Sequence, residues 1–202
     1  GIPAQFRDAE VEKFDFGIYG VDLSKLRKII KSYCDQFDLV KESGKGLYLW
    51  SATPGSGKTY LSCCILRTLI LQSGIQGRFA TAVDYLAVVG KSYEKSRERG
   101  ETDPSAVYRT CPVLVLDDLG TQKNGDWQEQ ELFRLIDTRL NNGLVTLITS
   151  NLPPENLNLN FRIVDRILKS SIVLQMPEVS VRRTQAEREQ ERFLSKLMGG
   201  GA

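Results

Sequence analysis

Residues 51–61 read SATPGSGKTYL and join two runs of different character. The run before them, LYLW at 47–50, has the length and apolar composition of a buried strand, and a helix is expected from Lys58 to Leu71. A small-residue loop between a strand and a helix surrounds an anion with backbone N–H groups and the helix N-terminus. The stretch therefore predicts a loop that binds the phosphates of a nucleotide.

The residue types in this loop fit that chemistry. Gly55 and Gly57 allow backbone angles that a side chain would obstruct. Lys58 can reach the β- and γ-phosphates, and the Thr59 hydroxyl can ligate Mg²⁺. The pattern G-x-x-x-x-G-K-[ST] begins with glycine where this chain has Ala52, but that position starts the turn away from the phosphates, so we expect the loop to function. The candidate ATP- or ADP-binding residues here are Thr53, Pro54, Gly55, Ser56, Gly57, Lys58, Thr59 and Tyr60.

An acidic pair ends the strongest strand signal of the chain, VLVLDD at 113–118. Asp117 would hold Mg²⁺ through water, with Thr59 as the second metal-binding residue. Asp118 is then the candidate to orient or deprotonate the water that attacks ATP. Its side chain is shorter than that of the glutamate often used for this task, so slow hydrolysis is expected. Acidic residues that merely cap a buried strand are the alternative, which two aspartates in succession fit poorly.

Composition places the chain among ordinary globular domains, with 202 residues, 41% hydrophobic, 26% charged and a formal net charge of +2. Histidine is absent, which removes the commonest metal ligand and the commonest general base. Cys34, Cys63, Cys64 and Cys111 form no C-x-x-C pair and are expected to be reduced and buried in a cytoplasmic protein. No apolar stretch reaches the length of a membrane span, so no membrane partner is expected.

Strand-like and helix-like runs alternate, which predicts an α/β fold with a mostly parallel sheet covered by helices on both faces. Strands are expected at 47–50, 77–82, 109–118, 144–150 and 171–176. Helices are expected at 24–37, 58–71, 83–97, 162–169 and 184–198, with one more that Asp126 caps and that carries Trp127, Leu132, Ile136 and Leu140. The last helix is mostly charged, and we expect its small apolar patch of Phe193, Leu194 and Leu197 to dock on the chain's own domain.

With these motifs in place, the chain resembles the AAA+ ATPases of the helicase-loader and IstB group, the DnaC/DnaI type. The likeness begins at GIPAQFRDAEVEKF and continues through ATPGSGKT, VLVLDDLG and DWQEQELFRLIDTRLNNGLVTLITSNL. It ends near RIVDRILKSSIVL and EVSVR and so covers nearly the whole chain. The resemblance implies a P-loop NTPase fold of the AAA+ class that binds ATP or ADP with Mg²⁺.

The resemblance also assigns roles to polar residues beyond the loop. In LITSNL, Asn151 matches the sensor-1 residue that feels the γ-phosphate, with a simple turn after the strand as the alternative. In RIVDRI, Arg166 matches the arginine finger that reaches the nucleotide of a neighbouring subunit, and Arg162 is a second candidate. The alternative for Arg166 is an ion pair within its own helix through Asp165. Arginine suits these tasks because its planar fork stays charged and binds phosphate oxygens in pairs.

The C-terminal part of the chain differs from many AAA+ proteins. In SVR, Arg182 looks like the sensor-2 arginine that acts within its own subunit, although Arg183 is adjacent. The segment after Met176 is too short for the full helical lid, so a reduced or absent lid is implied.

We expect one ATPase domain over 1–198, followed by a flexible tail at 199–202. The domain comprises a leading segment and first helix at 1–46, the P-loop core at 47–176 and a C-terminal segment at 177–198. The partner-binding N-terminal domain of helicase loaders is expected to be missing.

A basic run with an aromatic residue, KSYEKSRERG at 91–100, is a candidate contact for single-stranded DNA. The residues concerned are Lys91, Tyr93, Lys95, Arg97 and Arg99. Glu94 and Glu98 dilute the charge, so a solvated helix face is the alternative. The resemblance supports the DNA interpretation, because it implies an extra helical segment nearby that engages single-stranded DNA.

The favoured function is an ATP-switched loader that helps to place a replicative helicase on DNA. ATP would set an assembly-competent state through Arg166 in trans, and hydrolysis would release it. The implied partners are the helicase, single-stranded DNA and further copies of the chain that meet at the nucleotide sites. An IstB-type helper of DNA transposition would use the same core with a transposase. A P-loop small-molecule kinase fits less well because no arginine-rich acceptor lid is present, and a binding module with a dead site would show no hydrolysis.

Overall fold

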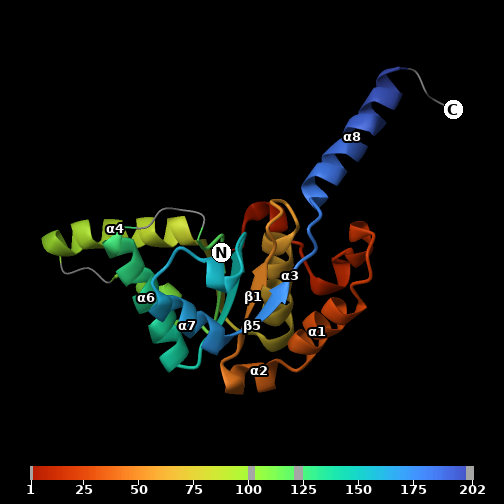
Figure 1. Ribbon diagram of the computed structural model, residues 1–202. Helices are drawn as coiled ribbons and strands as arrows, with labels where there is room; N and C mark the ends of the chain where they lie inside the picture. The colour runs from red at the N-terminus through yellow and green to blue at the C-terminus, as the bar shows by residue number, and fades with distance from the viewer. Residues whose placement is uncertain (1, 100–102, 121–124, 199–202) are drawn as a thin grey trace.

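In the computed structural model of the chain, five parallel strands form one sheet in the order β2-β3-β4-β1-β5 (Figure 1). The structure describes residues 2–99, 103–120 and 125–198, and the side chains at 93–99 lie outside this description. The strands are β1 Gly46–Trp50, β2 Gly77–Thr81, β3 Val113–Asp117, β4 Val145–Ser150 and β5 Ser171–Gln175. The predicted α/β fold with a parallel sheet is confirmed.

Helices connect the strands and cover both faces of the sheet. The α-helices are α1 Ser24–Asp35, α2 Phe37–Ser43, α3 Lys58–Ser73, α4 Ala82–Arg99, α5 Ala106–Thr110, α6 Asp126–Asn141, α7 Phe161–Ser170 and α8 Val181–Leu197. Short 3₁₀ turns occur at Ala4–Phe6 (η1), Val11–Lys13 (η2), Phe16–Tyr19 (η3) and Pro154–Asn156 (η4). Among the described residues, no helix has the length and apolar character needed to cross a membrane.

Two apolar cores lie on opposite faces of the sheet because successive strand side chains point to opposite sides. Leu47 and Leu49 of β1 join the core under α1, α3 and the N-terminal segment, residues 2–23. Tyr48, between them, joins the core formed with α4, α6 and α7. The inner strands β1, β3 and β4 are buried almost throughout, as expected for a parallel sheet covered on both faces. The four cysteines are buried free thiols, as predicted.

The strand order brings three segments with predicted roles to one edge of the sheet. The phosphate loop follows β1, Asp117 ends β3, and Asn151 follows β4, which lies between those two strands. Because all strands are parallel, these three positions lie at the carboxyl ends of neighbouring strands, where open α/β sheets bind their ligands. Sequence positions about a hundred residues apart therefore meet in one place.

Three predicted element boundaries were wrong in detail. The strand expected at 109–118 begins at Val113, because the preceding residues form helix α5 and Cys111 is extended before Pro112. Asp126 is the first residue of α6 rather than its cap, and the cap is Gly125, whose N–H donates to the Gln128 side chain. The helix expected at 24–37 ends at Asp35 as α1, and a separate helix that was not predicted, α2, begins at Phe37.

The predicted docking of the last helix on its own domain was also wrong. α8 begins at Val181, none of its residues is buried, and it projects away from the sheet and its covering helices (Figure 1). Phe193 is 64% exposed and Leu197 is 71% exposed. Val181 at the base of α8 packs against the core, but charged and polar residues separate it from the apolar patch at the far end, so the helix has no continuous apolar face to pack against the body.

Candidate nucleotide-binding site

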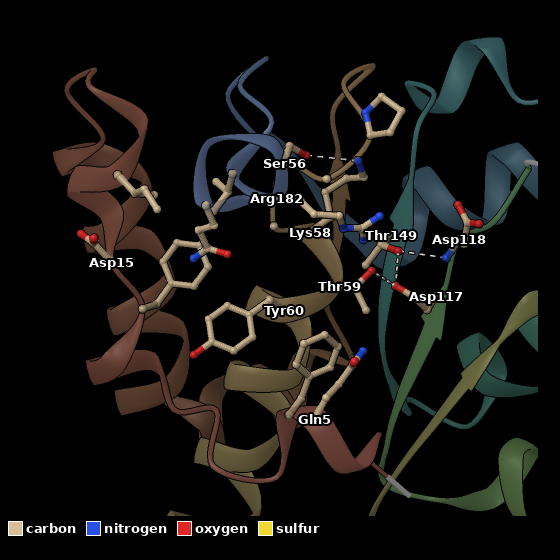
Figure 2. A pocket seen from close by; sticks show the side chains of 18 of the residues that line it. Gln5, Asp15, Ser56, Lys58, Thr59, Tyr60, Asp117, Asp118, Thr149 and Arg182 are labelled. Atoms are coloured by element: carbon tan, nitrogen blue, oxygen red, sulfur yellow. Dashed lines mark hydrogen bonds between the residues drawn. The ribbon is translucent and has the colours of Figure 1, made fainter. Parts of the chain in front are cut away.

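A cavity of about 760 Å³ opens at the carboxyl edge of the sheet (Figure 2). This volume is within the range of natural small-molecule sites. It gathers most of the residues that the sequence predicted: Pro54, Gly55, Ser56, Gly57, Lys58, Thr59, Tyr60, Asp117, Asp118, Asn151 and Arg182. Residues of the N-terminal segment line the cavity as well.

The two central glycines of the phosphate loop are required by both conformation and space. Gly55 has φ +78° and Gly57 has φ +89°, values that side-chain-bearing residues rarely adopt. A Cβ on Gly57 would lie 2.7 Å from the Tyr19 hydroxyl oxygen, and one on Gly55 would lie 2.9 Å from Ser180 Oγ. The loop is therefore enclosed by the N-terminal segment on one side and by the start of the C-terminal helix on the other.

Lys58 is buried at the base of the loop and its ammonium is held by loop atoms. Its Nζ donates to the carbonyl oxygens of Ser51 at 3.2 Å and Thr53 at 3.3 Å, and to Ser56 Oγ at 3.2 Å. Burial lowers the pKa of Lys58, and the negative charge of Asp118 and two further carboxylates opposes this shift. The ammonium is thus placed where the phosphate loop can present it to an anion.

The first acidic residue, Asp117, lies between two hydroxyl groups (Figure 2). Its Oδ1 accepts from Thr59 Oγ1 at 2.8 Å and from Thr149 Oγ1 at 2.6 Å. Burial raises the pKa of Asp117, and the two hydroxyl hydrogen bonds oppose the rise. Thr149 also accepts from the backbone N–H of Asp118 at 2.9 Å, so a single hydroxyl contacts both acidic residues.

The donor set around Asp117 fits Mg²⁺. Thr59 and Asp117 bring a hydroxyl and a carboxylate oxygen together, and hard cations prefer oxygen ligands. Within the described part of the chain, no group of three or more acidic, cysteine or histidine side chains is arranged to hold a metal ion without further ligands. Mg²⁺ normally keeps several water molecules and uses substrate phosphate oxygens, so one carboxylate and one hydroxyl are sufficient protein ligands.

The second acidic residue, Asp118, has an unusual backbone conformation. Its φ of +59° lies in the left-handed region, where aspartate and asparagine are tolerated better than most residues. Its exposed side chain lines the cavity, and Asn151 Nδ2 lies 3.4 Å from its Oδ1. The predicted water-activating carboxylate and the predicted sensor amide therefore face each other.

The arginines predicted from the resemblance lie in different places. Arg182, at the start of α8, lines the cavity, whereas Arg183 is 81% exposed and pairs with Glu187 at 2.9 Å. Arg166 and Arg162, on α7, are not among the residues that line the cavity of their own chain. The Arg166 guanidinium bonds the Asp137 carboxylate of α6 and lies over a neighbouring phenyl ring.

Some candidate residues lie outside the cavity or outside the description. Thr53 does not line the cavity, because its N–H and hydroxyl both donate to Glu178. Lys91 is exposed on α4. The side chains of the other predicted DNA contacts, Tyr93, Lys95, Arg97 and Arg99, lie outside the described residues.

The sequence interpretation missed the contribution of the N-terminal segment. Phe14 and Tyr19 line the cavity, and the Tyr19 hydroxyl donates to the Ser56 carbonyl oxygen at 2.7 Å. The rings of Phe14 and Tyr60 stack with centroids 5.8 Å apart, which gives the cavity an aromatic wall. The clustered aromatic residues of FDFGIYG, 14–20, were a signal that could have indicated this wall. Thr149 carried no comparable signal, since any buried strand can contain threonine.

Comparison with known proteins identifies the family. Residues 6–189 match the family described as IstB-like ATP binding protein. The replicative helicase loader DnaI of Bacillus subtilis (strain 168) is 26% identical over 131 residues, which cover 64% of this chain and 40% of DnaI. The replicative helicase loader DnaC of Buchnera aphidicola subsp. Acyrthosiphon pisum (strain APS) is 22% identical over 157 residues, 75% of this chain and 62% of that protein. The chain thus spans less than two thirds of either relative.

Solved structures agree with this family and fold. A crystal structure of the DnaC helicase loader aligns with a TM-score of 0.74 and 25% identity, covering 87% of this chain and all of that chain. The replication initiator DnaA bound to AMPPCP and single-stranded DNA aligns with a TM-score of 0.68 over 84% of this chain and 50% of that chain, and at 17% identity it shows the fold alone. The expected resemblance and the AAA+ fold are confirmed. The chain belongs to the IstB-like ATP binding protein family.

Proposed function

We propose that this chain is an AAA+ ATPase switch that binds ATP, hydrolyses it slowly and helps to load a replicative helicase onto DNA. The observation that carries the ATPase part is the meeting of Thr59 from the phosphate loop with Asp117 from β3, at the wall of the cavity that holds Lys58. The helicase part is supported by the similarity to two replicative helicase loaders.

Each residue of the site has a role in this proposal. The N–H groups of the phosphate loop and Lys58 bind the phosphates. Thr59 and Asp117 hold Mg²⁺, which neutralises charge on the phosphates when bound. Asp118 orients the attacking water and accepts its proton, and Asn151, 3.4 Å from it, keeps that carboxylate directed into the cavity.

The arginines give the switch its sensitivity to neighbours. Arg182 contacts the nucleotide of its own subunit from the cavity wall. Arg166 acts in trans on the nucleotide of an adjoining copy, so self-association depends on bound ATP. Its guanidinium then leaves the Asp137 carboxylate and binds phosphate oxygens. A guanidinium can bind either group through two parallel N–H donors.

Binding and hydrolysis are separated by two variants. Lys58→Ala should weaken ATP binding strongly but measurably, whereas Asp118→Asn should bind ATP as the wild type does and release little phosphate. Asparagine tolerates the positive φ at this position, so the second variant should fold normally. Equilibrium binding of a fluorescent ATP analogue and a phosphate-release assay measure the two effects. Unchanged hydrolysis by Asp118→Asn would refute the role of Asp118.

The partner is tested by co-purification with a hexameric replicative helicase in ATP, in ADP and without nucleotide. We expect retention that depends on ATP, and phosphate release that single-stranded DNA or helicase stimulates. Removing the charges of Lys95, Arg97 and Arg99 together should weaken single-strand binding and flatten its salt dependence. Nucleotide-dependent retention of a transposase in place of the helicase would favour a helper of transposition.

A further inference from the structure

A glutamate from the far end of the sequence binds the first turn of the phosphate loop. Glu178 follows β5, and its carboxylate accepts the N–H of Ala52 at 3.0 Å and the N–H of Thr53 at 2.7 Å. The hydroxyls of Thr53, at 2.7 Å, and Ser51, at 3.1 Å, donate to it as well. Four donors of the loop thus converge on one carboxylate, and Gln175 Nε2 donates to it at 3.5 Å as well.

One peptide group that Glu178 binds also binds Lys58. The carbonyl of Ser51 and the N–H of Ala52 belong to one peptide group, which accepts from Lys58 Nζ at 3.2 Å and donates to Glu178 at 3.0 Å. The two peptide groups that flank Thr53 are divided between the same partners, because the Thr53 N–H donates to Glu178 and the Thr53 carbonyl oxygen accepts from Lys58 at 3.3 Å. The Glu178 carboxylate therefore binds N–H groups, and the Lys58 ammonium binds carbonyl oxygens, of the same short stretch of backbone, residues 51–53.

The surrounding segment keeps Glu178 in place. The Ser51 hydroxyl also lies 3.2 Å from the carbonyl oxygen of Pro177, and the N–H of Arg182 donates to the carbonyl of Gly55 at 3.3 Å. Burial works to raise the pKa of Glu178, but hydrogen bonds from Thr53 and the loop amides outweigh it and the pKa is lowered. Glu178 is therefore ionised at neutral pH.

We propose that Glu178 is a positioning residue for nucleotide binding, acting on Lys58 through the peptides of residues 51–53. This inference rests on the proposed function and adds a residue to it. Its carboxylate occupies the N–H groups of Ala52 and Thr53, which leaves those of the following loop residues for phosphate. By polarising the Ser51–Ala52 peptide, it strengthens the Ser51 carbonyl oxygen as an acceptor for the ammonium, and by binding the Thr53 N–H it fixes the residue whose carbonyl is the second acceptor. Loss of the charge lets Lys58 leave its position.

The test compares Glu178→Gln with Glu189→Gln, a matched change at an exposed glutamate of α8 that contacts no part of the site. Glutamine keeps the shape of the side chain but has one acceptor oxygen and no charge, so it cannot satisfy four donors. We expect Glu178→Gln to weaken binding of a fluorescent ATP analogue about tenfold, the effect of losing one charged hydrogen bond. Glu189→Gln should bind as the wild type does.

Two further measurements identify the route of the effect. In a Lys58→Ala background, Glu178→Gln should cause little additional loss of affinity, because the group on which it acts is gone. In the nucleotide-free chain, an amine-reactive reagent should label Lys58 severalfold more in Glu178→Gln than in the wild type, with exposed Lys91 as the internal standard and melting temperature as the check on folding.

The outcomes separate the two proposals. Unchanged labelling of Lys58 in Glu178→Gln, or an equal loss of affinity with and without Lys58, overturns the role of Glu178. A wild-type chain that binds no ATP overturns the proposed function, while the labelling experiment still decides the role of Glu178 because it uses no nucleotide.

Discussion

The hydroxyl of Thr149 determines how the acidic pair is presented. It donates to Asp117 Oδ1 and accepts from the N–H of Asp118, whose φ is +59°. The hydrogen bond to the backbone fixes the peptide that joins the two aspartates, so one side chain turns inward to Thr59 and the other toward Asn151. Adjacent residues of the same type thereby gain different surroundings and can take different roles.

Asp117, the aspartate that turns inward, should lower the stability of the nucleotide-free chain. Because burial disfavours its charged form, Asp117→Asn should raise the melting temperature of the nucleotide-free chain by about 2–4 °C, which corresponds to ~1 kcal/mol at this chain length. The Thr59 and Thr149 hydroxyls can still donate to the asparagine oxygen. Differential scanning fluorimetry measures the shift, and Mg²⁺-dependent phosphate release should be lost.

The sign of this effect depends on pH. A carboxyl whose pKa is raised by folding destabilises the folded state above that raised pKa and has no such effect below the unfolded value of about 3.9. The rise in melting temperature caused by Asp117→Asn should therefore be greatest near pH 7 and should disappear as the pH falls towards 4. A constant difference across this range, or a lower melting temperature near pH 7, would contradict the assignment of burial as the cause.

At the scale of elements, a buried arginine joins a helix to two neighbouring segments. Arg139 of α6 is 1% exposed. Its guanidinium donates to Thr146 Oγ1 and the Val145 carbonyl in β4, and to the carbonyl oxygens of Tyr108 and Cys111 around the end of α5. These acceptors are neutral, and burial lowers the pKa of the guanidinium. Arg139 thus supplies donors to carbonyl oxygens at the end of α5 and the start of β4.

Removing this arginine should be strongly destabilising. Arg139→Ala leaves three carbonyls and a hydroxyl without their donors in a buried site, so the free energy of unfolding should fall by at least ~3 kcal/mol. Urea denaturation measures the change. Arg192→Ala, at an exposed arginine of α8, serves as the control and should have little effect. Similar losses for the two variants would show that Arg139 adds nothing beyond helix propensity.

The elements that were predicted from sequence were those with a strong local pattern. The apolar runs of β1, β3 and β4 predicted buried strands, and the glycine-rich loop predicted the helix that follows it, α3. The start of β3 was misplaced because Arg109 and Thr110 look equally suited to a strand or a helix. Their helix is nucleated by Asp103, whose carboxylate accepts the N–H of Ser105 at 2.8 Å, and Pro112 ends it. Those polar and proline signals were present in the sequence but are weaker than an apolar run.

The site was predictable where one short motif contains the chemistry. Lys58, Thr59 and Asp117 follow from local spacing, and the structure places them together. Thr149 and Glu178 were not predictable, because each acts on residues that are distant in the sequence. Glu178 is 126 residues from Ala52, and only the parallel pairing of β5 with β1 brings the two together.

At the scale of the whole molecule, α8 is an appendage whose base and far end have different roles. Its first residues, including Arg182, contact the phosphate loop. Its far end carries exposed Phe193, Leu197 and Met198 and contributes no buried residue. The base therefore belongs to the site, whereas the far end adds little to the stability of the fold.

A chain that ends at Arg188 should test this division. Because the deleted part of α8 contains no buried residue, the melting temperature should change by less than about 2 °C, and ATP binding should be kept. A chain that ends at Met176 also loses Glu178 and Arg182, and it should lose ATP binding. Calorimetry and binding of a fluorescent ATP analogue measure the two effects. A large loss of stability in the chain that ends at Arg188 would contradict the division.

Because α8 projects from the body, a small rotation at its base would displace its far end by a larger distance. The helix has 17 residues and is therefore about 25 Å long. With its base bonded to Gly55, a rotation of about 10° there would carry the far end through about 4 Å on that length. A spectroscopic label near Met198 would thus report a rotation at the phosphate loop without being placed in the site.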